Sequence, residues 1–529
     1  FMKMFDTMTE VVKQGGIRRG ANMGIMNSNH PDIERFITAK KGNKALTNFN
    51  ISVLLMGDFW EYYENDKPYP LVNPRNGEVV KTISAKMLFD TLVYQAWESA
   101  EPGVIFYDTC NKYNPFFDSL GPIVTTNPCG EVLLYPNEPC NLGSINVWAF
   151  AKEDLDGNIY YDWNGLNDVV HKSVKLLDNV IDINKFPLKQ IEEMSLLTRK
   201  IGLGVMGLGD LLYELRLAYD SDEGRKFIEK IMQFIEYHSK MASVDLAKVR
   251  GKMPYFDKSF YKDGKMPVRG FELKEEWDFD WDKVALDIKT YGIRNGFTTV
   301  IAPTGSISMI AGCSSGIEPV FSLAFEKNVK VGSFYYIDPA FKRVLKKEGL
   351  YSDELMEEIC SNNGSVEGLL DFPSELQKVF VTATSMTPES HIRALASVQK
   401  WVDSSISKTN NFPADATVDD MKESYVLAHK LGCKGVTVFR DSSIKNQVLV
   451  AGKKRTEVKE AATVTEVPEA PQTIADDNGT NGTEDISSGN LTTKITGKAK
   501  HQICPDCGAK TQIQEGCVSC KGCGWALCK

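Results

Sequence analysis

Amphipathic helical patterns alternate along this chain with short runs of β-branched and aromatic residues, and this alternation limits the possible folds more than any other feature. The longest helical patterns begin at Ser84 and Ser221, and β-rich runs lie at 51–55, 297–301 and 436–439. Both serines are typical helix N-caps. Because helices that alternate with strands usually cover a parallel sheet, we predict an α/β fold, and the residues alone suggest a TIM barrel.

Composition limits the classes of function. The chain has 529 residues, of which 42% are hydrophobic, so it can bury a large core. Its net charge of −9 gives no general attraction to nucleic acid or to anionic membranes. The sequence contains neither an apolar run of about 18 residues nor a signal-peptide pattern. Its 12 cysteines indicate thiol or metal chemistry in a reducing compartment, so we expect a cytoplasmic protein.

The composition changes after residue 451. Residues 452–500 are rich in Glu, Thr, Ala, Pro, Asp, Asn and Gly and contain almost no large apolar side chains. Such a segment cannot bury enough surface to offset the entropy of ordering, which predicts a flexible acidic linker. We therefore expect three parts: a globular region at 1–451, the linker, and a cysteine-rich tail at 501–529.

The segment Asn127-Pro128-Cys129-Gly130-Glu131 places an amide, a thiol and a carboxylate at alternate positions. In an extended backbone these three side chains would share one face and could converge on one ligand. Gly130 would let the backbone bend or approach a substrate closely. The alternative is an edge strand with a buried cysteine, since cysteine is often an interior residue.

Two glycine-containing segments are candidates for phosphate binding. In Thr304-Gly305-Ser306-Ile307-Ser308, backbone N–H groups and hydroxyls could surround an anion after the β-rich run at 297–301, although an ordinary turn is equally compatible. Gly202-x-Gly204-x-x-Gly207 spells a dinucleotide fingerprint. However, two basic residues precede it where a buried strand should end, and no acidic residue follows on an identifiable strand. We expect these glycines to permit close packing.

Several segments together resemble the large chain of ribonucleotide reductase, in the same order and over about Phe1 to Ser443. They are Gln14–Asn22, His30–Glu34, Asn127–Glu131, Cys140–Asn146, Ile201–Asp210, Ala302–Ser308 and Gly316–Pro319. The resemblance implies a ten-stranded α/β barrel with the reactive cysteine on an internal loop. It also implies that a region with an allosteric nucleotide site and a redox cysteine precedes Phe1.

The resemblance implies a role for each residue near the thiol. Cys129 would carry a thiyl radical that takes the ribose 3′ hydrogen, Glu131 would be the base on the 3′ hydroxyl, and Asn127 would hydrogen-bond the sugar hydroxyls. Cys140 and the upstream cysteine would supply two reducing equivalents. Residues 304–308 would bind the phosphates of the ribonucleotide substrate, and the similarity favours diphosphates.

The radical source follows from residues that are absent. Oxygen-dependent reductases use two adjacent tyrosines where this chain has Val436–Asp441, and glycyl-radical reductases need an arginine that Gly522–Trp525 lacks. The adenosylcobalamin-dependent class remains, and the tail resembles it too. No Asp-x-His-x-x-Gly motif occurs, and this class does not need one. A separate radical-generating subunit is the alternative.

The tail contains two C-x-x-C knuckles, Cys504/Cys507 and Cys520/Cys523, which predict a tetrathiolate zinc site in a zinc-ribbon-like unit. The resemblance assigns Cys517 and Cys528 to a redox shuttle that receives electrons from thioredoxin or glutaredoxin-like donors. Two alternatives stay open: Cys517 could replace Cys523 as a zinc ligand, which would leave Cys523 and Cys528 as the shuttle, or the ribbon could be purely structural.

Two other classes of function would use the same features differently. One is a zinc-ribbon protein that binds nucleic acid, against which the acidic linker and the lack of a basic stripe both argue. The other is a nicotinamide dehydrogenase built on the glycine fingerprint. The reductase interpretation requires no nucleic-acid or membrane partner and is compatible with a homodimer.

Overall fold

The computed structural model describes residues 1–14, 18–43, 45–329, 332–441 and 443, together with the backbone of 511–514, 517–520 and 526–528. The chain divides into two compact units, Phe1–Thr456 and Glu457–Lys529. The boundaries predicted at 451 and 500 stay predictions. No helix in the described part combines the length and the apolar character that crossing a membrane requires.

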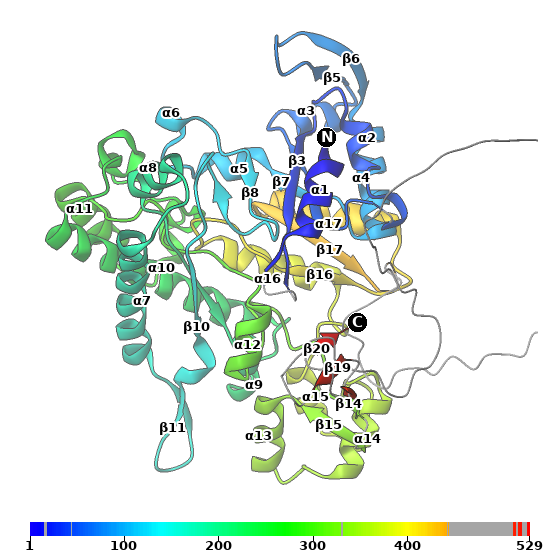
Figure 1. The fold of residues 1–529 in the computed structure, drawn as a ribbon. Helices are drawn as coiled ribbons and strands as arrows, with labels where there is room; N and C mark the ends of the chain where they lie inside the picture. The colour runs from blue at the N-terminus through cyan, green and yellow to red at the C-terminus, as the bar shows by residue number, and fades with distance from the viewer. Residues whose placement is uncertain are drawn as a thin grey trace, which may run out of the picture. The chain divides into compact units, whose positions relative to one another are not determined.

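The largest sheet among the described residues has five strands, of which β3, β7, β16 and β17 are labelled in Figure 1. Its order is β16-β17-β7-β4-β3, and all neighbours are parallel except β17 and β7, which are antiparallel. The strands are β3 (Asn22–Asn27), β4 (Phe49–Leu55), β7 (Gly103–Phe106), β16 (Thr409–Phe412) and β17 (Gly435–Arg440). A TIM barrel has only parallel strands, so the first interpretation from the residues alone was wrong.

The series of strands continues beyond β16. Ile301 and Ile406 form a parallel bridge, as do Leu203 and Thr299. Leu203 lies in β13 (Gly202–Met206), which pairs in parallel with β10 (Leu142–Asn146). The run predicted as a strand at 297–301 is therefore extended between two parallel neighbours, although only isolated bridges mark it.

The helix N-caps predicted from sequence are confirmed. Ser84 accepts a hydrogen bond from the N–H of Met87 and begins α4 (Ala85–Ser99). Ser221 accepts from Gly224 and begins α10 (Asp222–Arg250), which has acidic residues in its first turn and basic residues in its last. This charge distribution complements the helix dipole. The other long helices of the unit are α7 (Trp163–Ile183), α8 (Lys189–Thr198), α11 (Trp281–Tyr291), α16 (Pro388–Gln399) and α17 (Val418–Lys430).

Two apolar cores lie within the first unit. The larger joins the sheet to the long helices, and the smaller is built mainly from residues 320–380. Elements of the smaller core are β14 (Ala324–Val329), β15 (Gly332–Ile337), α13 (Pro339–Lys347), α14 (Asp353–Ser361) and α15 (Ser374–Val379).

The remaining elements lie outside the five-stranded sheet. The helices are α1 (Met2–Val11), α2 (Ile33–Ile37), α3 (Phe59–Glu64), α5 (Tyr107–Lys112), α6 (Phe117–Leu120), α9 (Leu208–Glu214) and α12 (Gly305–Ala311). The two-stranded hairpins are β1 (Lys13–Gln14) with β2 (Arg18–Arg19), β5 (Pro68–Val72) with β6 (Val79–Ser84), β8 (Thr125–Thr126) with β9 (Leu133–Leu134), and β11 (Ala151–Glu153) with β12 (Ile159–Tyr161). Single turns of 3₁₀ helix lie at Lys41–Asn43, Val147–Phe150, Phe256–Lys258, Phe260–Asp263, Arg269–Glu272 and Lys274–Glu276.

Candidate active site

The segment Asn127–Glu131 forms a tight turn between β8 and β9, and the extended conformation predicted for it was wrong. The N–H of Gly130 donates to the carbonyl of Asn127 at 3.0 Å, and Gly130 has a φ of 83°. The Asn127 side chain accepts a hydrogen bond from the N–H of Val132 at 3.0 Å. Asn, Pro and Gly at the first, second and fourth positions are typical of a β-turn, which explains the difference.

This turn brings together the four side chains predicted to be catalytic. Asn127 donates a hydrogen bond to the Glu131 carboxylate. Cys129 and Cys140 are both exposed, and Cys140 lies within electrostatic range of both Glu131 and Cys129. Two thiols and one carboxylate therefore lie near one another, and a turn rather than a strand gathers them.

Glu131 has an unusual environment for a carboxylate. It is only 2% exposed, and burial raises its pKa, while hydrogen bonds from its own backbone and from Asn127 oppose that shift. Its Oε2 has no hydrogen-bond partner among the described residues. A buried carboxyl group with a raised pKa and an unused oxygen is suited to proton transfer with a bound ligand.

Cys140 is held in its thiol form at neutral pH. Although the residue as a whole is exposed, protein atoms around the sulfur partly desolvate it. This desolvation, together with the charges of Glu131, Glu138 and Cys129, raises the pKa of the Cys140 thiol to about 11. A thiol with so high a pKa is a weak nucleophile at neutral pH, because the thiolate is the reactive form.

Polar groups from distant parts of the chain fix the Asn127–Glu131 turn. Asn50 in β4 donates to the carbonyl of Pro128 at 2.7 Å. The hydroxyl of Ser404 and the N–H of Ser405 both donate to the carbonyl of Glu131 at 2.8 Å. Neither serine was predicted from the sequence to contact the site. The only signal for them was an Asp-Ser-Ser run enclosed by Val402 and Ile406, which indicates buried polar groups.

The predicted phosphate-binding segment forms the start of α12. Thr304 is buried with a φ of 53°, and its hydroxyl accepts from the N–H of Gly316 at 2.7 Å. The Ser308 hydroxyl shares a hydrogen bond with Ser315 at 2.8 Å. Ser306 is exposed, and no side chain caps the first turn of the helix. The hydroxyls of Thr304 and Ser308 thus hold the following loop, and Gly305, Ser306 and Ile307 present the helix N-terminus.

The glycines of the apparent dinucleotide fingerprint lie in and just after β13. A Cβ on Gly204 would be 2.4 Å from the carbonyl oxygen of Val300, and one on Gly202 would be 2.5 Å from the Val300 side chain. Only glycine allows this close approach of two strands. The expectation of close packing is confirmed.

Three strands of the second unit are described. They are β18 (Thr511–Gln514), β19 (Cys517–Cys520) and β20 (Ala526–Cys528), which form an antiparallel sheet. Cys517 pairs with Cys528 across β19 and β20, and Cys520 pairs with Thr511. Cys504, Cys507 and Cys523 lie outside the described residues. Among the described residues, no group of three or more metal-ligating side chains occurs.

Comparison with known proteins identifies the family. Residues 1–439 match the barrel domain of ribonucleotide reductase, and the chain belongs to this family. A vitamin B12-dependent ribonucleoside-diphosphate reductase of Thermoplasma acidophilum is 44% identical over 469 residues, which are 88% of this chain and 57% of that protein.

Two further relatives are more distant. The protein of the same name from Mycobacterium tuberculosis is 40% identical over 85% of this chain and 60% of its own length. A vitamin B12-dependent ribonucleotide reductase of Streptomyces coelicolor is 31% identical over 89% of this chain and 53% of its own length. The chain thus spans between half and three fifths of the length of these relatives.

Proposed function

We propose that the protein reduces ribonucleotides to 2′-deoxyribonucleotides, with diphosphates as the preferred substrates and adenosylcobalamin as the radical source. The observation that carries the proposal is the exposed Cys129 thiol on a turn beside the buried Glu131 and the second thiol, Cys140. The names of the relatives support the same reaction and the same cofactor.

The chain's own residues have distinct roles in this proposal. Cys129, as a thiyl radical, takes the 3′ hydrogen of the ribose, and Glu131 accepts the proton of the 3′ hydroxyl. Asn127 hydrogen-bonds the sugar hydroxyls, and the 2′ hydroxyl leaves as water. Cys140 and a second thiol supply two electrons and two protons and become a disulfide, so that the reaction balances. The start of α12, at Thr304–Ser308, binds the phosphates through its N–H groups.

The site fits a cofactor that reacts with the thiol directly. When bound, adenosylcobalamin supplies the radical equivalent that Cys129 requires. Cys129 is exposed, so its sulfur can be reached by a large group. The stretch Val436–Asp441, most of which lies in β17, corresponds to the segment in which oxygen-dependent relatives have a tyrosine pair. It contains no tyrosine, so it offers no phenol to relay a radical.

We propose that the complete barrel has ten strands with the Asn127–Glu131 turn inside it. The described strands support a continuous series of eight extended segments: β10, β13, 297–301, 404–412, β17, β7, β4 and β3. The reversal between β17 and β7 divides this series into two groups of parallel strands.

For the tail, we propose that Cys517 and Cys528 are the redox shuttle and that Cys504, Cys507, Cys520 and Cys523 bind zinc. Residues directly opposite in an antiparallel pair have Cα atoms about 4.5–5.5 Å apart, which suits a disulfide between Cys517 and Cys528. Cys520 of the second knuckle pairs with Thr511, which follows the first knuckle in sequence. This pairing supports a zinc site to which both knuckles contribute. Cys528→Ser should stop turnover driven by thioredoxin but spare turnover driven by dithiothreitol, and Cys523→Ser should instead reduce the zinc content.

The deciding experiment incubates the protein with a ribonucleoside diphosphate, adenosylcobalamin and dithiothreitol and measures the deoxyribonucleotide formed. We expect product only when the cofactor is present. Product that requires a second protein and no cobalamin would instead favour a separate radical-generating subunit. Cobalamin-independent NADH oxidation without deoxyribonucleotide would overturn the proposal.

A further inference from the structure

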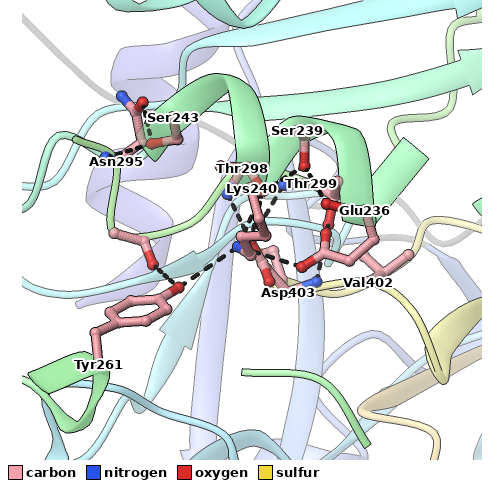
Figure 2. A network of polar contacts seen from close by, with 12 residues as sticks. Glu236, Ser239, Lys240, Ser243, Tyr261, Asn295, Thr298, Thr299, Val402 and Asp403 are labelled. Atoms are coloured by element: carbon pink, nitrogen blue, oxygen red, sulfur yellow. Dashed lines mark hydrogen bonds and ion pairs between the residues drawn. The ribbon is translucent and has the colours of Figure 1, made fainter. Parts of the chain in front are cut away.

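A fully buried polar network lies beneath the site and has no part in the chemistry described above. Lys240 of α10 forms ion pairs with Glu236 and Asp403, and none of these three side chains is exposed (Figure 2). The Asp403 carboxylate also accepts hydrogen bonds from the N–H of Thr298 at 2.5 Å and from the Thr298 hydroxyl at 3.1 Å. The network therefore joins α10, the strand 297–301 and the segment after α16.

The charges of the network balance one another. Burial and the neighbouring Asp403 raise the pKa of Glu236 well above its usual value, which favours the protonated form of Glu236. Although burial opposes it, the Lys240 charge lowers the pKa of Asp403, which remains a carboxylate. One ammonium group faces one carboxylate, which is the condition under which buried charges are tolerated.

A second lysine fixes the backbone that follows Asp403. The buried Lys434 Nζ donates to the carbonyls of Val402, Asp403 and Ser404 at 3.3, 2.5 and 3.0 Å. Gln399 of α16 donates to the carbonyls of Val402 and Ser404 as well. The side chains of Lys434 and Gln399 thus fix the segment 402–404, in addition to the contact between Lys240 and Asp403.

This fixed segment ends at the Asn127–Glu131 turn. The Ser404 hydroxyl donates to the Glu131 carbonyl at 2.8 Å and accepts from the N–H of Leu133 at 2.9 Å, and the N–H of Ser405 adds a second bond to the same carbonyl. We call these contacts of Ser404 and Ser405 the clamp. The clamp fixes the backbone directly after the Glu131 side chain, from the Glu131 carbonyl to the Leu133 N–H, so it restricts where the carboxylate lies.

The same segment also bonds to the strand that leads to the phosphate-binding start of α12. The N–H of Ser404 donates to the carbonyl of Thr299 at 3.2 Å, and Ile301 and Ser405 are hydrogen-bonded at 3.3 Å. The buried segment 402–405 therefore contacts both the Glu131 backbone and the strand that leads to the 304–308 segment.

We propose that Ser404 is a positioning residue for Glu131, held in register by the Lys240–Asp403 pair and by Lys434. The proposal rests on the proposed role of Glu131 as the base. A base must lie within about 2.6–3.2 Å of the proton that it moves, and a displacement of about 1 Å can cost about 100-fold in rate. A hydroxyl that fixes the backbone of that base therefore affects catalysis without touching substrate.

The test compares Ser404→Ala with Ser243→Ala. Ser243 is a matched control because it is also buried, accepts one backbone N–H at 3.0 Å and donates one hydrogen bond at 2.8 Å, both with Asn295. We expect Ser404→Ala to lower kcat about 10- to 100-fold with little change in KM, and Ser243→Ala to leave both unchanged. Ser404→Thr keeps the hydroxyl and should restore most of the rate.

A second measurement needs no turnover. Part of the high pKa of Cys140 comes from the Glu131 charge, and the remainder from burial, Glu138 and Cys129. If Glu131 moves away in Ser404→Ala, the Cys140 thiol should ionise at lower pH and be alkylated about threefold faster at pH 9, as followed for its own peptide by mass spectrometry. Ser243→Ala should leave that rate unchanged.

These readouts separate the two proposals. Faster alkylation of Cys140 in a protein that forms no deoxyribonucleotide would support the clamp and count against the reductase function. Wild-type alkylation and wild-type kcat in Ser404→Ala, or equal changes in both alanine variants, would overturn the positioning role. If Ser404→Ala does not fold, Ser404→Cys keeps the volume while weakening the hydrogen bonds, and the same comparison applies.

Discussion

Two polar regions of this molecule differ in how their buried ionisable groups are paired. In the Lys240 network, three fully buried ionisable side chains lie in contact and an ammonium group faces the carboxyl groups, although Glu236 Oε1 and Asp403 Oδ1 each lack a hydrogen bond among the described residues. In the Asn127–Glu131 turn, Glu131 is nearly as deeply buried, but its Oε2 has no partner among the described residues and the two neighbouring thiols are exposed.

The contrast separates a region that supports the fold from a region that can bind a ligand. A balanced network is a rigid support, since every alternative arrangement leaves a charge unpaired in a medium of low dielectric constant. An unpaired buried carboxyl group is costly unless a ligand completes it. The segment Asp403–Ser405 connects the two regions, because Asp403 belongs to the network and Ser404 hydrogen-bonds to the Glu131 carbonyl. The network therefore supports the backbone beside the unpaired carboxyl group.

The strongest test of this contrast is removal of the exposed thiol. We expect Cys129→Ser to lower turnover by at least about 1,000-fold, since serine cannot form the sulfur radical, while nucleotide binding stays as in the wild type. Deoxyribonucleotide formation and equilibrium dialysis with the nucleotide measure the two quantities. Cys313→Ser removes a half-buried thiol outside the turn and should have little effect. Substantial turnover by the Cys129 variant would contradict the radical assignment.

Removal of the network's cation should lower the stability of the fold. Lys240→Met leaves the Asp403 carboxylate buried without its ion pair and should lower the free energy of unfolding by about 3–5 kcal/mol. Urea denaturation measures the change. The double variant Lys240→Met/Asp403→Asn removes both charges and should recover part of the loss. If the single variant is as stable as the wild type, the network is not the support inferred here.

Lys434 is a buried ammonium group whose hydrogen bonds, among the described residues, all go to backbone carbonyl oxygens rather than to a carboxylate. Burial lowers the pKa of Lys434 to about 8 from the usual 10.5. Between these values the unfolded chain binds more protons than the folded protein, so raising the pH favours folding. From pH 8 to 10.5 the wild type should gain up to about 3 kcal/mol in unfolding free energy relative to Lys434→Met. Parallel pH dependences in the two proteins would refute the lowered pKa.

Glu131 should govern the acidic limb of the activity profile. The pKa of its carboxyl group is raised by burial, so the base is protonated and inactive at pH values where an exposed glutamate would still be ionised. We expect kcat/KM to fall as the pH drops through this raised pKa, and Glu131→Gln to lower kcat about 100-fold and abolish the limb. An unchanged limb in the variant would assign it to another group. Glu229→Gln is a suitable control away from the turn.

Local sequence signals predicted the elements well and the site only in part. The caps at Ser84 and Ser221 act within three residues of themselves, and the strands containing 51–55 and 436–439 follow from their own apolar runs. The Asn127–Glu131 segment shows the alternation of a strand, but the turn preferences of Asn, Pro and Gly decide its conformation.

The remaining features depend on contacts between distant parts of the chain. Ser404 reaches Glu131 across 273 positions of sequence, and β17 lies beside β7 only in the folded sheet. No window of sequence contains both members of either pair. The gathering of Cys129, Cys140 and Glu131 was predictable because the three are close in the chain.

The position of β17 has a consequence for how the chain is made. β7, complete by Phe106, pairs on one side with β4 and on the other with β17, which ends at Arg440. During synthesis from the N-terminus, one edge of β7 must therefore wait for more than three hundred further residues to leave the ribosome. An exposed strand edge is a template for unwanted association, so nascent chains that stall before residue 435 should be the ones that need chaperone protection.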